Sequence, residues 1–228
     1  MLSSVTPIRQ LTDDFENRFR TGDTPWEDPH PWAGLDKLFE RFASSGTSIL
    51  DVGCGLGTNA LRLATLGYRV RGIDVSQTAI EKAITRRNAA GLDCEFLCAN
   101  IFTGDHGNWD IVFDRGCLHG FADTSSRARF ALSVATVLQP GGLWIDISGS
   151  NENAESPDII QKLALPRLTL ADLAAATESN FETIEIRQGV FGMMPDTDFR
   201  AWVGIYRRRK FDILAVSSQY NMTSENLS

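Results

Sequence analysis

The chain has 228 residues, of which 43% are hydrophobic and 22% are charged, a composition that is ordinary for one globular domain with additions. Its net charge of −7 argues against a large phosphate-binding face, so we expect no nucleic-acid partner. No apolar run approaches the roughly 18 residues of a membrane span, and Met1 to Ser4 lack the basic and apolar regions of a secretion signal. We therefore predict a cytoplasmic protein without a membrane partner.

Residues 1–43 are predicted to form a prefix, or lid, ahead of the main domain. Leu11, Phe15 and Phe19 fall at helical spacing, and a second apolar stripe runs from Leu35 to Phe42. The prefix should therefore contain two helices, which are separated by a stretch rich in turn-forming residues.

The segment Ser48 to Asp51 is an apolar run that ends in an acid, and Gly53, Gly55 and Gly57 follow it at alternating positions. This pattern predicts a buried strand, a tight turn and a helix whose exposed N–H groups favour an anionic ligand. A dinucleotide fingerprint, G-x-G-x-x-G, would require a glycine where Thr58 stands. The loop is therefore of a nucleotide-binding type, but it does not match the pattern of NAD-binding proteins.

A second acid ends the next predicted strand, which runs from Tyr68 to Asp74. A carboxylate at this strand end can accept hydrogen bonds from both hydroxyls of a ribose. This requirement is common to NAD and to S-adenosylmethionine, so only the glycine pattern separates the two cofactors. A solvated acid without a ligand is the alternative reading of Asp74.

The rest of the chain alternates between strand-like apolar runs and segments with helical spacing. The main domain is predicted to span 44–210, and a C-terminal tail is predicted at 211–228. The further predicted strands are 94–98, 109–114, 143–148, 181–187 and 201–206.

Three motifs carry a resemblance to known proteins. The Asp-x-Gly-x-Gly-x-Gly pattern that begins at Asp51 resembles the first motif of the class I S-adenosylmethionine-dependent methyltransferases, and Pro140-Gly141-Gly142 before a predicted strand is similar to the same family. The Phe-x-x-x-Phe-Arg and Gly-x-x-Pro-Trp segments between Phe15 and Trp26 resemble the thiol and thiopurine S-methyltransferases. The resemblance covers roughly residues 11 to 208.

The resemblance implies an α/β fold with a doubly wound, seven-stranded, mostly parallel sheet, which is the Rossmann-like methyltransferase fold with an N-terminal helical lid. It also implies S-adenosylmethionine as the cofactor. Family members usually have an acid at the position of Asn100, and an asparagine can still accept with its carbonyl oxygen. The implied cofactor-binding residues are Trp26, Asp51, Gly53, Cys54, Gly55, Asp74, Val75, Asn100, Ile101 and Asp114.

Residues after the fourth predicted strand should border the reaction centre, because ligands gather at the carboxyl ends of the strands. His119 is the candidate for taking a proton from a thiol or for stabilising the thiolate. Asp114 is expected to orient His119 or Arg115, or to touch the cofactor, and these three are the candidate catalytic residues. A structural role for His119 or for Asp114 remains open.

No metal site is expected. The four cysteines contain no C-x-x-C pair and no histidine cluster with zinc spacing, which indicates reduced thiols. Catechol-type O-methyltransferases hold a divalent metal with an Asp-Asn pair after the fifth strand, whereas Asp146 is followed by Ile147 here.

The predicted function is transfer of a methyl group to a small molecule, and a thiol or sulfide sulfur is the expected acceptor. Three alternatives are a small-molecule O-methyltransferase, a protein that binds S-adenosylmethionine without catalysis, and an NAD-dependent dehydrogenase. The chain is expected to act as a monomer or homodimer.

Overall fold

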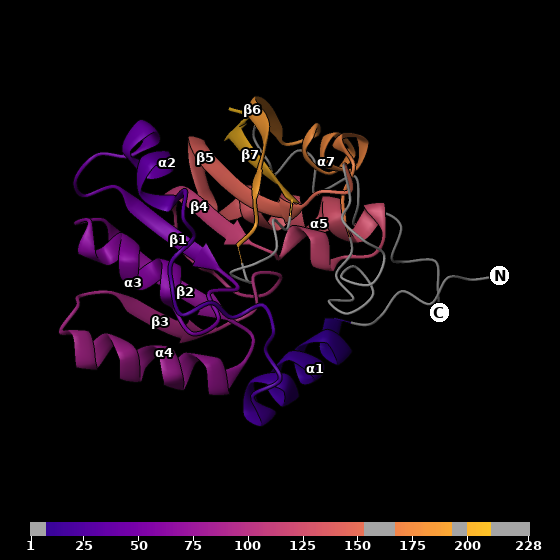
Figure 1. Cartoon of the computed structure of the whole chain (residues 1–228). Helices are drawn as coiled ribbons and strands as arrows, with labels where there is room; N and C mark the ends of the chain where they lie inside the picture. The colour runs from indigo at the N-terminus through magenta and orange to yellow at the C-terminus, as the bar shows by residue number, and fades with distance from the viewer. Residues whose placement is uncertain (1–7, 153–166, 193–199, 211–228) are drawn as a thin grey trace.

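The computed structural model describes residues 8–152, 167–192 and 200–210, so the predicted tail at 211–228 lies outside the described residues. The described chain forms a seven-stranded sheet with helices on both faces (Figure 1). Its strands are β1 (Ser48–Val52), β2 (Arg69–Asp74), β3 (Glu95–Cys98), β4 (Trp109–Arg115), β5 (Leu138–Gly149), β6 (Phe181–Val190) and β7 (Arg200–Arg208).

The strand order is β3-β2-β1-β4-β5-β7-β6. Strands β1 to β5 run parallel, and β7 pairs antiparallel with both β5 and β6. The prediction of a doubly wound, mostly parallel, seven-stranded sheet is therefore confirmed. Strands β2 and β3 are added on one side of β1, whereas β4 and β5 are added on its other side. Open α/β sheets bind ligands at the point between β1 and β4 where the strand order switches in this way.

Two hydrophobic clusters cover the two faces of the sheet. Helices α2, α3 and α4 contribute to one cluster, and α5 and α7 contribute to the other. Strand β1 is buried throughout. Its consecutive residues Ile49 and Leu50 belong to opposite clusters, because successive side chains of a strand point to opposite faces of the sheet. The helices are α1 (Ile8–Thr21), α2 (Leu35–Phe42), α3 (Thr58–Thr65), α4 (Gln77–Ala90), α5 (Thr124–Val137) and α7 (Leu170–Thr177), with a short 3₁₀ turn, η1, at Leu118–Gly120.

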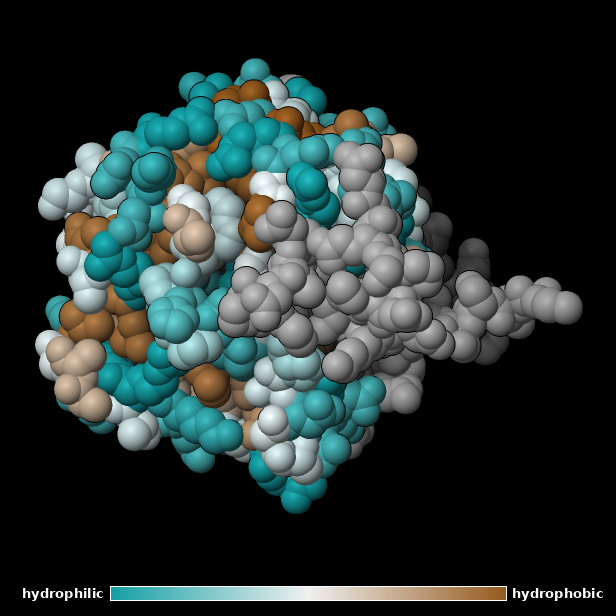
Figure 2. Space-filling view, viewed as in Figure 1, coloured by the Kyte–Doolittle hydropathy of each residue, from teal (hydrophilic) through white to brown (hydrophobic). Residues whose placement is uncertain are grey.

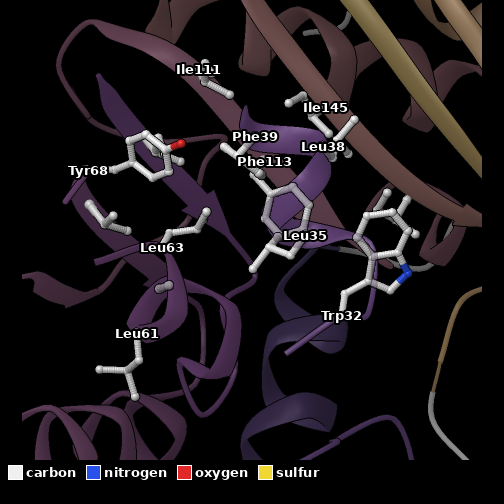
Figure 3. Close-up of a cluster of buried hydrophobic side chains, with 14 of the residues drawn as sticks. Trp32, Leu35, Leu38, Phe39, Leu61, Leu63, Tyr68, Ile111, Phe113 and Ile145 are labelled. Atoms are coloured by element: carbon white, nitrogen blue, oxygen red, sulfur yellow. The ribbon is translucent and has the colours of Figure 1, made fainter. Parts of the chain in front are cut away.

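Trp32 joins the segment before α2 to two distant parts of the chain. Its backbone N–H donates to Asn59 Oδ1 in α3 at 2.9 Å, and its indole Nε1 donates to the carbonyl oxygen of Val190 at the end of β6 at 2.7 Å. Beside it, Leu35 and Phe39 of α2 are fully buried in the core (Figure 3). The second helix of the predicted prefix is thus packed with the main domain, and a domain boundary directly after it stays a prediction.

Helix α1 lies apart from the sheet, near the N-terminal end of α4 (Figure 1). Glu16 of α1 accepts hydrogen bonds from Ser76 Oγ at 2.6 Å, from Thr78 Oγ1 at 2.6 Å and from Thr78 N at 3.2 Å. These bonds lower the pKa of Glu16, and Lys82 Nζ adds a bond to the carbonyl oxygen of Phe19. A carboxylate is favoured at a helix N-terminus. Helix α1 is therefore fixed to α4, while its action as a lid stays a prediction.

Hydrophilic residues predominate on the face shown in Figure 2, and hydrophobic residues lie among them in small groups. The exposed large hydrophobic residues come from separate elements of the described chain, which include β3, α7 and β6. None of the described helices is long and apolar enough to cross a membrane.

Candidate active site

A pocket lies at the carboxyl ends of β1, β2 and β4, and the segment from Thr12 to Asp28 closes its other side. All but one of the residues expected in the site line this pocket, the exception being Asp114. The expected residues that line it are Trp26, Asp51, Gly53, Cys54, Gly55, Asp74, Val75, Asn100, Ile101, Arg115 and His119.

Bare backbone forms the floor of the pocket between β1 and α3. Gly53 and Gly55 have positive φ values of 65° and 52°. A Cβ on Gly53 would lie 2.3 Å from Cys117 Sγ, and one on Gly55 would lie 2.2 Å from Glu27 Oε1. Both positions therefore favour glycine by their conformation, and the side chains of Cys117 and Glu27 pack directly against the bare backbone.

Asp74 is held rigidly at the end of β2. Its Oδ1 accepts from the backbone N–H of Ser76 and its Oδ2 accepts from that of Gly55, each at 2.9 Å. Burial raises the pKa of Asp74, while these hydrogen bonds favour its ionised form. Each oxygen keeps a further lone pair, so the carboxylate can still accept hydrogen bonds from two ribose hydroxyls.

Asp51 at the end of β1 has an unused hydrogen-bonding atom. Its Oδ2 is buried and has no hydrogen-bond partner among the described residues. Burial is the main cause of its strongly raised pKa, and the neighbouring charge of Asp114 adds to the effect. A buried polar atom without a partner is costly, so this oxygen fits a ligand that brings a positively charged donor.

Aromatic rings from the segment before α2 form another wall of the pocket. Trp26 packs edge-on against Phe15 and Phe19, with ring centroids 5.7 and 6.0 Å apart. An aromatic face attracts a cation such as a sulfonium. One face of the Trp26 ring already carries a cation, because the guanidinium of Arg18 lies 4.2 Å from its centroid.

Asn100 and its neighbours line the pocket beyond β3. Its side-chain oxygen accepts from the backbone N–H of Phe102 at 3.0 Å, so the oxygen expected to receive an adenine amino group already has one partner. A second lone pair remains on that oxygen. Val75 and Ile101 add apolar surface that suits the faces of a flat ring.

Asp114 does not line the pocket, and the structure corrects the role expected for it. The side chain is fully buried and accepts from Trp144 Nε1 at 2.8 Å, Cys117 N at 3.1 Å and Leu118 N at 3.4 Å. Burial raises the pKa of Asp114 to about 6. Its carboxylate therefore fixes the loop after β4 from behind, and these hydrogen bonds go to neither His119 nor Arg115.

His119 lies in η1 with its ring almost completely buried. Its Nδ1 accepts a hydrogen bond of 2.7 Å from the backbone N–H of Gly149, at the end of β5. Burial and the charges of Arg115 and Arg167 lower the pKa of His119 to about 4. The ring is consequently neutral at pH 7, with its proton on Nε2.

This protonation state favours the second of the two roles predicted for His119, stabilising a thiolate, over the first, taking a proton from a thiol. The only nitrogen with a lone pair in the ring plane, Nδ1, already accepts from Gly149, and Nε2 offers a proton rather than a lone pair. Nε2 lies beside Gly116, which lines the pocket, and the ring packs against Phe191 with centroids 5.3 Å apart. His119 is therefore positioned as a hydrogen-bond donor.

Arg115 brings a positive charge to the same wall. Its Nη2 donates to the carbonyl oxygen of Trp26 at 3.2 Å, whereas its buried Nη1 has no hydrogen-bond partner among the described residues. The guanidinium lies 5.4 Å from the ring centroid of Phe191. Burial lowers the pKa of Arg115, but an arginine remains charged at neutral pH. The wall after β4 thus presents one cation and one neutral donor.

Glu27 and Phe191 line the pocket and were not expected there. Glu27 directly follows Trp26 in a turn-rich stretch, and no periodicity in such a stretch indicates where a side chain points. Phe191 follows the last residue of β6, at a position that only the pairing of the C-terminal strands determines. Among the described residues, no group of three or more His, Cys, Asp or Glu side chains is arranged to hold a metal ion.

Comparisons with known proteins agree with this site. Residues 49–142 match a family model described as a methyltransferase domain. The ubiquinone biosynthesis O-methyltransferase of Thiobacillus denitrificans is 33% identical over 119 residues, which cover 51% of this chain and 50% of that protein. An uncharacterized methyltransferase of Schizosaccharomyces pombe is 37% identical over 99 residues, which cover 42% of this chain and 63% of the relative. The chain spans about half the length of the ubiquinone-biosynthesis relatives it matches.

Solved structures match over most of the chain. One, described as "Conversion of a Disulfide Bond into a Thioacetal Group during Echinomycin Biosynthesis", has a TM-score of 0.77 and 25% identity, and the match covers 96% of this chain and 100% of the other. The 1,6-didemethyltoxoflavin-N1-methyltransferase of Burkholderia thailandensis, with bound S-adenosylhomocysteine, has a TM-score of 0.71 and 16% identity, with 92% of each chain covered.

Residues 49–142, which include the glycine loop, thus match a methyltransferase domain, and the fold is the one found in solved S-adenosylmethionine-dependent methyltransferases. Solved structures of this fold are described with bound S-adenosylmethionine or S-adenosylhomocysteine, in agreement with the cofactor expected from the sequence. The residues present fit this group, because Asp51 offers an unpartnered buried oxygen and the carboxylate of Asp74 lies at the neighbouring strand end of the same pocket.

Proposed function

We propose that this protein methylates a small-molecule sulfur nucleophile, a thiol or sulfide, that reacts as its anion. The observation that carries the proposal is the pair of donors on the wall after β4, the cationic Arg115 and the neutral His119. A small-molecule acceptor, a cytoplasmic setting, action as a monomer or homodimer, and the absence of nucleic-acid and membrane partners are parts of the same proposal.

The two hydrogen-bond donors, Arg115 and His119, favour an acceptor that carries a negative charge. S-adenosylmethionine supplies an electrophilic methyl group on a cationic sulfur. Arg115 and His119 stabilise an anion next to that group and so favour loss of the acceptor's proton to solvent before attack. A thiol with a pKa of ~8.5 is already a few per cent ionised at neutral pH, whereas a phenol with a pKa of ~10 is far less so. An amine is disfavoured, because the lone pair that must attack would instead accept from His119 Nε2.

The acceptor side of the pocket is apolar, which suits a sulfur compound that must leave water before reaction. Phe121 and Phe191 line it together with Phe102 and Phe130. A dry site also aligns the reacting atoms and excludes competing water. The structure described as the conversion of a disulfide into a thioacetal, which matches nearly the whole chain, concerns sulfur chemistry and supports this choice.

Transfer to oxygen is the second candidate, because several matched relatives are named ubiquinone biosynthesis O-methyltransferases. Two features of the site apply equally to it, since Arg115 and His119 would also stabilise a phenolate. The matched region, however, spans about half of those relatives.

The test compares three acceptors of the same shape: benzenethiol, phenol and aniline. Release of S-adenosylhomocysteine is measured for each at equal concentration and at several pH values. We expect the thiol to react fastest, with a rate that rises as the thiol ionises. A faster phenol would replace the proposal with O-methylation, and a faster aniline would refute the role of the donors. Cofactor binding without turnover of these acceptors or of hydrogen sulfide would indicate a binding protein.

A further inference from the structure

Glu27 has no part in the chemistry proposed so far, although its carboxylate reaches the floor of the pocket. A Cβ built on Gly55 would lie 2.2 Å from Glu27 Oε1 and 3.4 Å from Phe19 Cζ, so both side chains pack over this glycine. The backbone N–H of Leu56 donates to the Glu27 carboxylate. The side chain therefore spans from the segment before α2 to the glycine loop that faces the cofactor.

The surroundings of Glu27 leave its charge poorly balanced. Arg115 and Arg86 attract the carboxylate and Asp74 repels it, yet no described side chain forms an ion pair with Glu27. Burial is the largest influence and raises the pKa of Glu27 to about 7. A buried carboxylate without a cationic partner is costly, and a bound cation reduces that cost.

Two acids of the pocket thus form no ion pair with a described side chain, and the methyl donor carries two positive centres, an ammonium and a sulfonium. Asp51 lies at the end of β1 and offers one free, buried oxygen. Glu27 also lines the pocket and is next in sequence to Trp26, whose ring belongs to the aromatic wall. The aromatic wall and the adjacent carboxylate of Glu27 together attract a sulfonium more strongly than the carboxylate of Asp51 alone.

We infer that Glu27 binds the sulfonium charge of S-adenosylmethionine and makes the pocket discriminate between the charged donor and the uncharged thioether of its product. The inference rests on the methyl donor of the proposed function and is independent of the acceptor. The product, S-adenosylhomocysteine, keeps the ammonium and loses only the sulfonium charge. A carboxylate directed at the sulfonium therefore favours the donor and promotes product release.

The same geometry predicts an unusual kinetic signature. The sulfonium charge is being lost as the methyl group moves, so a carboxylate beside it stabilises the bound donor more than the transition state. Removal of the carboxylate should weaken donor binding without lowering kcat. A residue that merely shaped the glycine loop would affect donor and product equally.

The experiment measures binding of S-adenosylmethionine, S-adenosylhomocysteine and sinefungin, which carries an ammonium in place of the sulfonium, by isothermal titration calorimetry at pH 8. Glu27→Gln should weaken S-adenosylmethionine and sinefungin about tenfold, the equivalent of one pKa unit, and change S-adenosylhomocysteine less than about twofold. Glu40→Gln removes the same charge from the exposed side of α2, outside the pocket, and should change none of the three affinities. Glu27→Ala provides a second variant if Glu27→Gln fails to fold.

Equal weakening of all three ligands would overturn the inference, because it would assign Glu27 to the shared ammonium or to the loop. Tighter binding of all three would overturn it as well and identify Glu27 as an obstruction of the site. None of these measurements uses an acceptor, so the proposal on sulfur can fail while this one holds. If neither the wild-type protein nor Glu40→Gln binds the donor, the cofactor assignment itself is at fault.

Discussion

Replacing His119 by asparagine or by glutamine separates the two functions of its ring. The side-chain oxygen of an asparagine lies close to the position of Nδ1 and can still accept from the Gly149 N–H, but nothing replaces the Nε2 donor. The longer glutamine can direct an N–H toward the pocket, whereas it leaves the Gly149 N–H without a partner. His119→Asn therefore removes the donor, and His119→Gln removes the link to β5.

The size of each effect follows from the hydrogen bond that is lost. A hydrogen bond to a charged group contributes about 1.5–3 kcal/mol, so His119→Asn should lower kcat/KM for a thiol roughly 10- to 150-fold, at 1.4 kcal/mol per factor of ten. His119→Gln should keep more activity but lose about 1–3 kcal/mol of unfolding free energy, since a buried N–H is left unsatisfied.

The assays are S-adenosylhomocysteine release at subsaturating acceptor and urea unfolding of both variants. A pH profile adds a direct test, because the pKa of His119 is held near 4 by burial. The wild-type rate should show no inflection caused by this histidine between pH 5 and 8. An inflection near pH 6.5 that His119→Asn abolishes would refute the reasoning and restore His119 as a base. An asparagine variant with wild-type kcat/KM would refute the donor role.

Further predictions concern the loop, the floor and the prefix of the site. Asp114→Asn should lower the free energy of unfolding in urea by about 1–3 kcal/mol, because the NH₂ group of the asparagine would then face one of the three N–H groups that now donate to the carboxylate. Gly55→Ala should weaken S-adenosylmethionine more than tenfold in calorimetry, because the new Cβ meets Glu27 and the φ of 52° disfavours alanine; unchanged affinity would contradict the proposed floor. Glu16→Gln should cost less than about 1 kcal/mol overall and speed hydrogen exchange in α1. The pKa of Glu27 in the folded state, about 7, lies above the usual 4.5. The contribution of Glu27 to the stability of the protein should therefore decline as the pH rises from 4.5 to 7. The Tm of unliganded Glu27→Gln should fall less than the wild-type Tm over this pH range.

The donor side of the site was largely predictable from the sequence. Asp51 ends an apolar run and Asp74 ends a short alternating strand, and parallel strands bring such ends to one edge of the sheet. Gly53 and Gly55 stand where a tight turn needs positive φ, and the structure finds 65° and 52° there. Local pattern is sufficient for these positions because each depends on a strand and the turn that follows it.

The acceptor side depends on contacts between segments that are far apart, and local pattern does not reveal these. The tautomer of His119 is determined by the N–H of Gly149, which belongs to another strand. Asp114 resembles other acids at strand ends, yet Trp144 turns it into a buried support for the loop. Glu27 reaches Gly55 across an irregular segment. The residues were identifiable as candidates, whereas their roles required the tertiary structure.

The hydrogen bond between Trp32 and Val190 also has a consequence for biosynthesis. Ribosomes make the chain from its first residue, so the glycine loop and both acids of β1 and β2 emerge long before β6 and Phe191. A nascent chain that ends before β6 contains the groups proposed to hold a nucleoside but lacks Phe191, which packs beside His119. The half of the pocket proposed to receive the methyl group is therefore completed last, when the C-terminal strands join the sheet and Trp32 gains its partner.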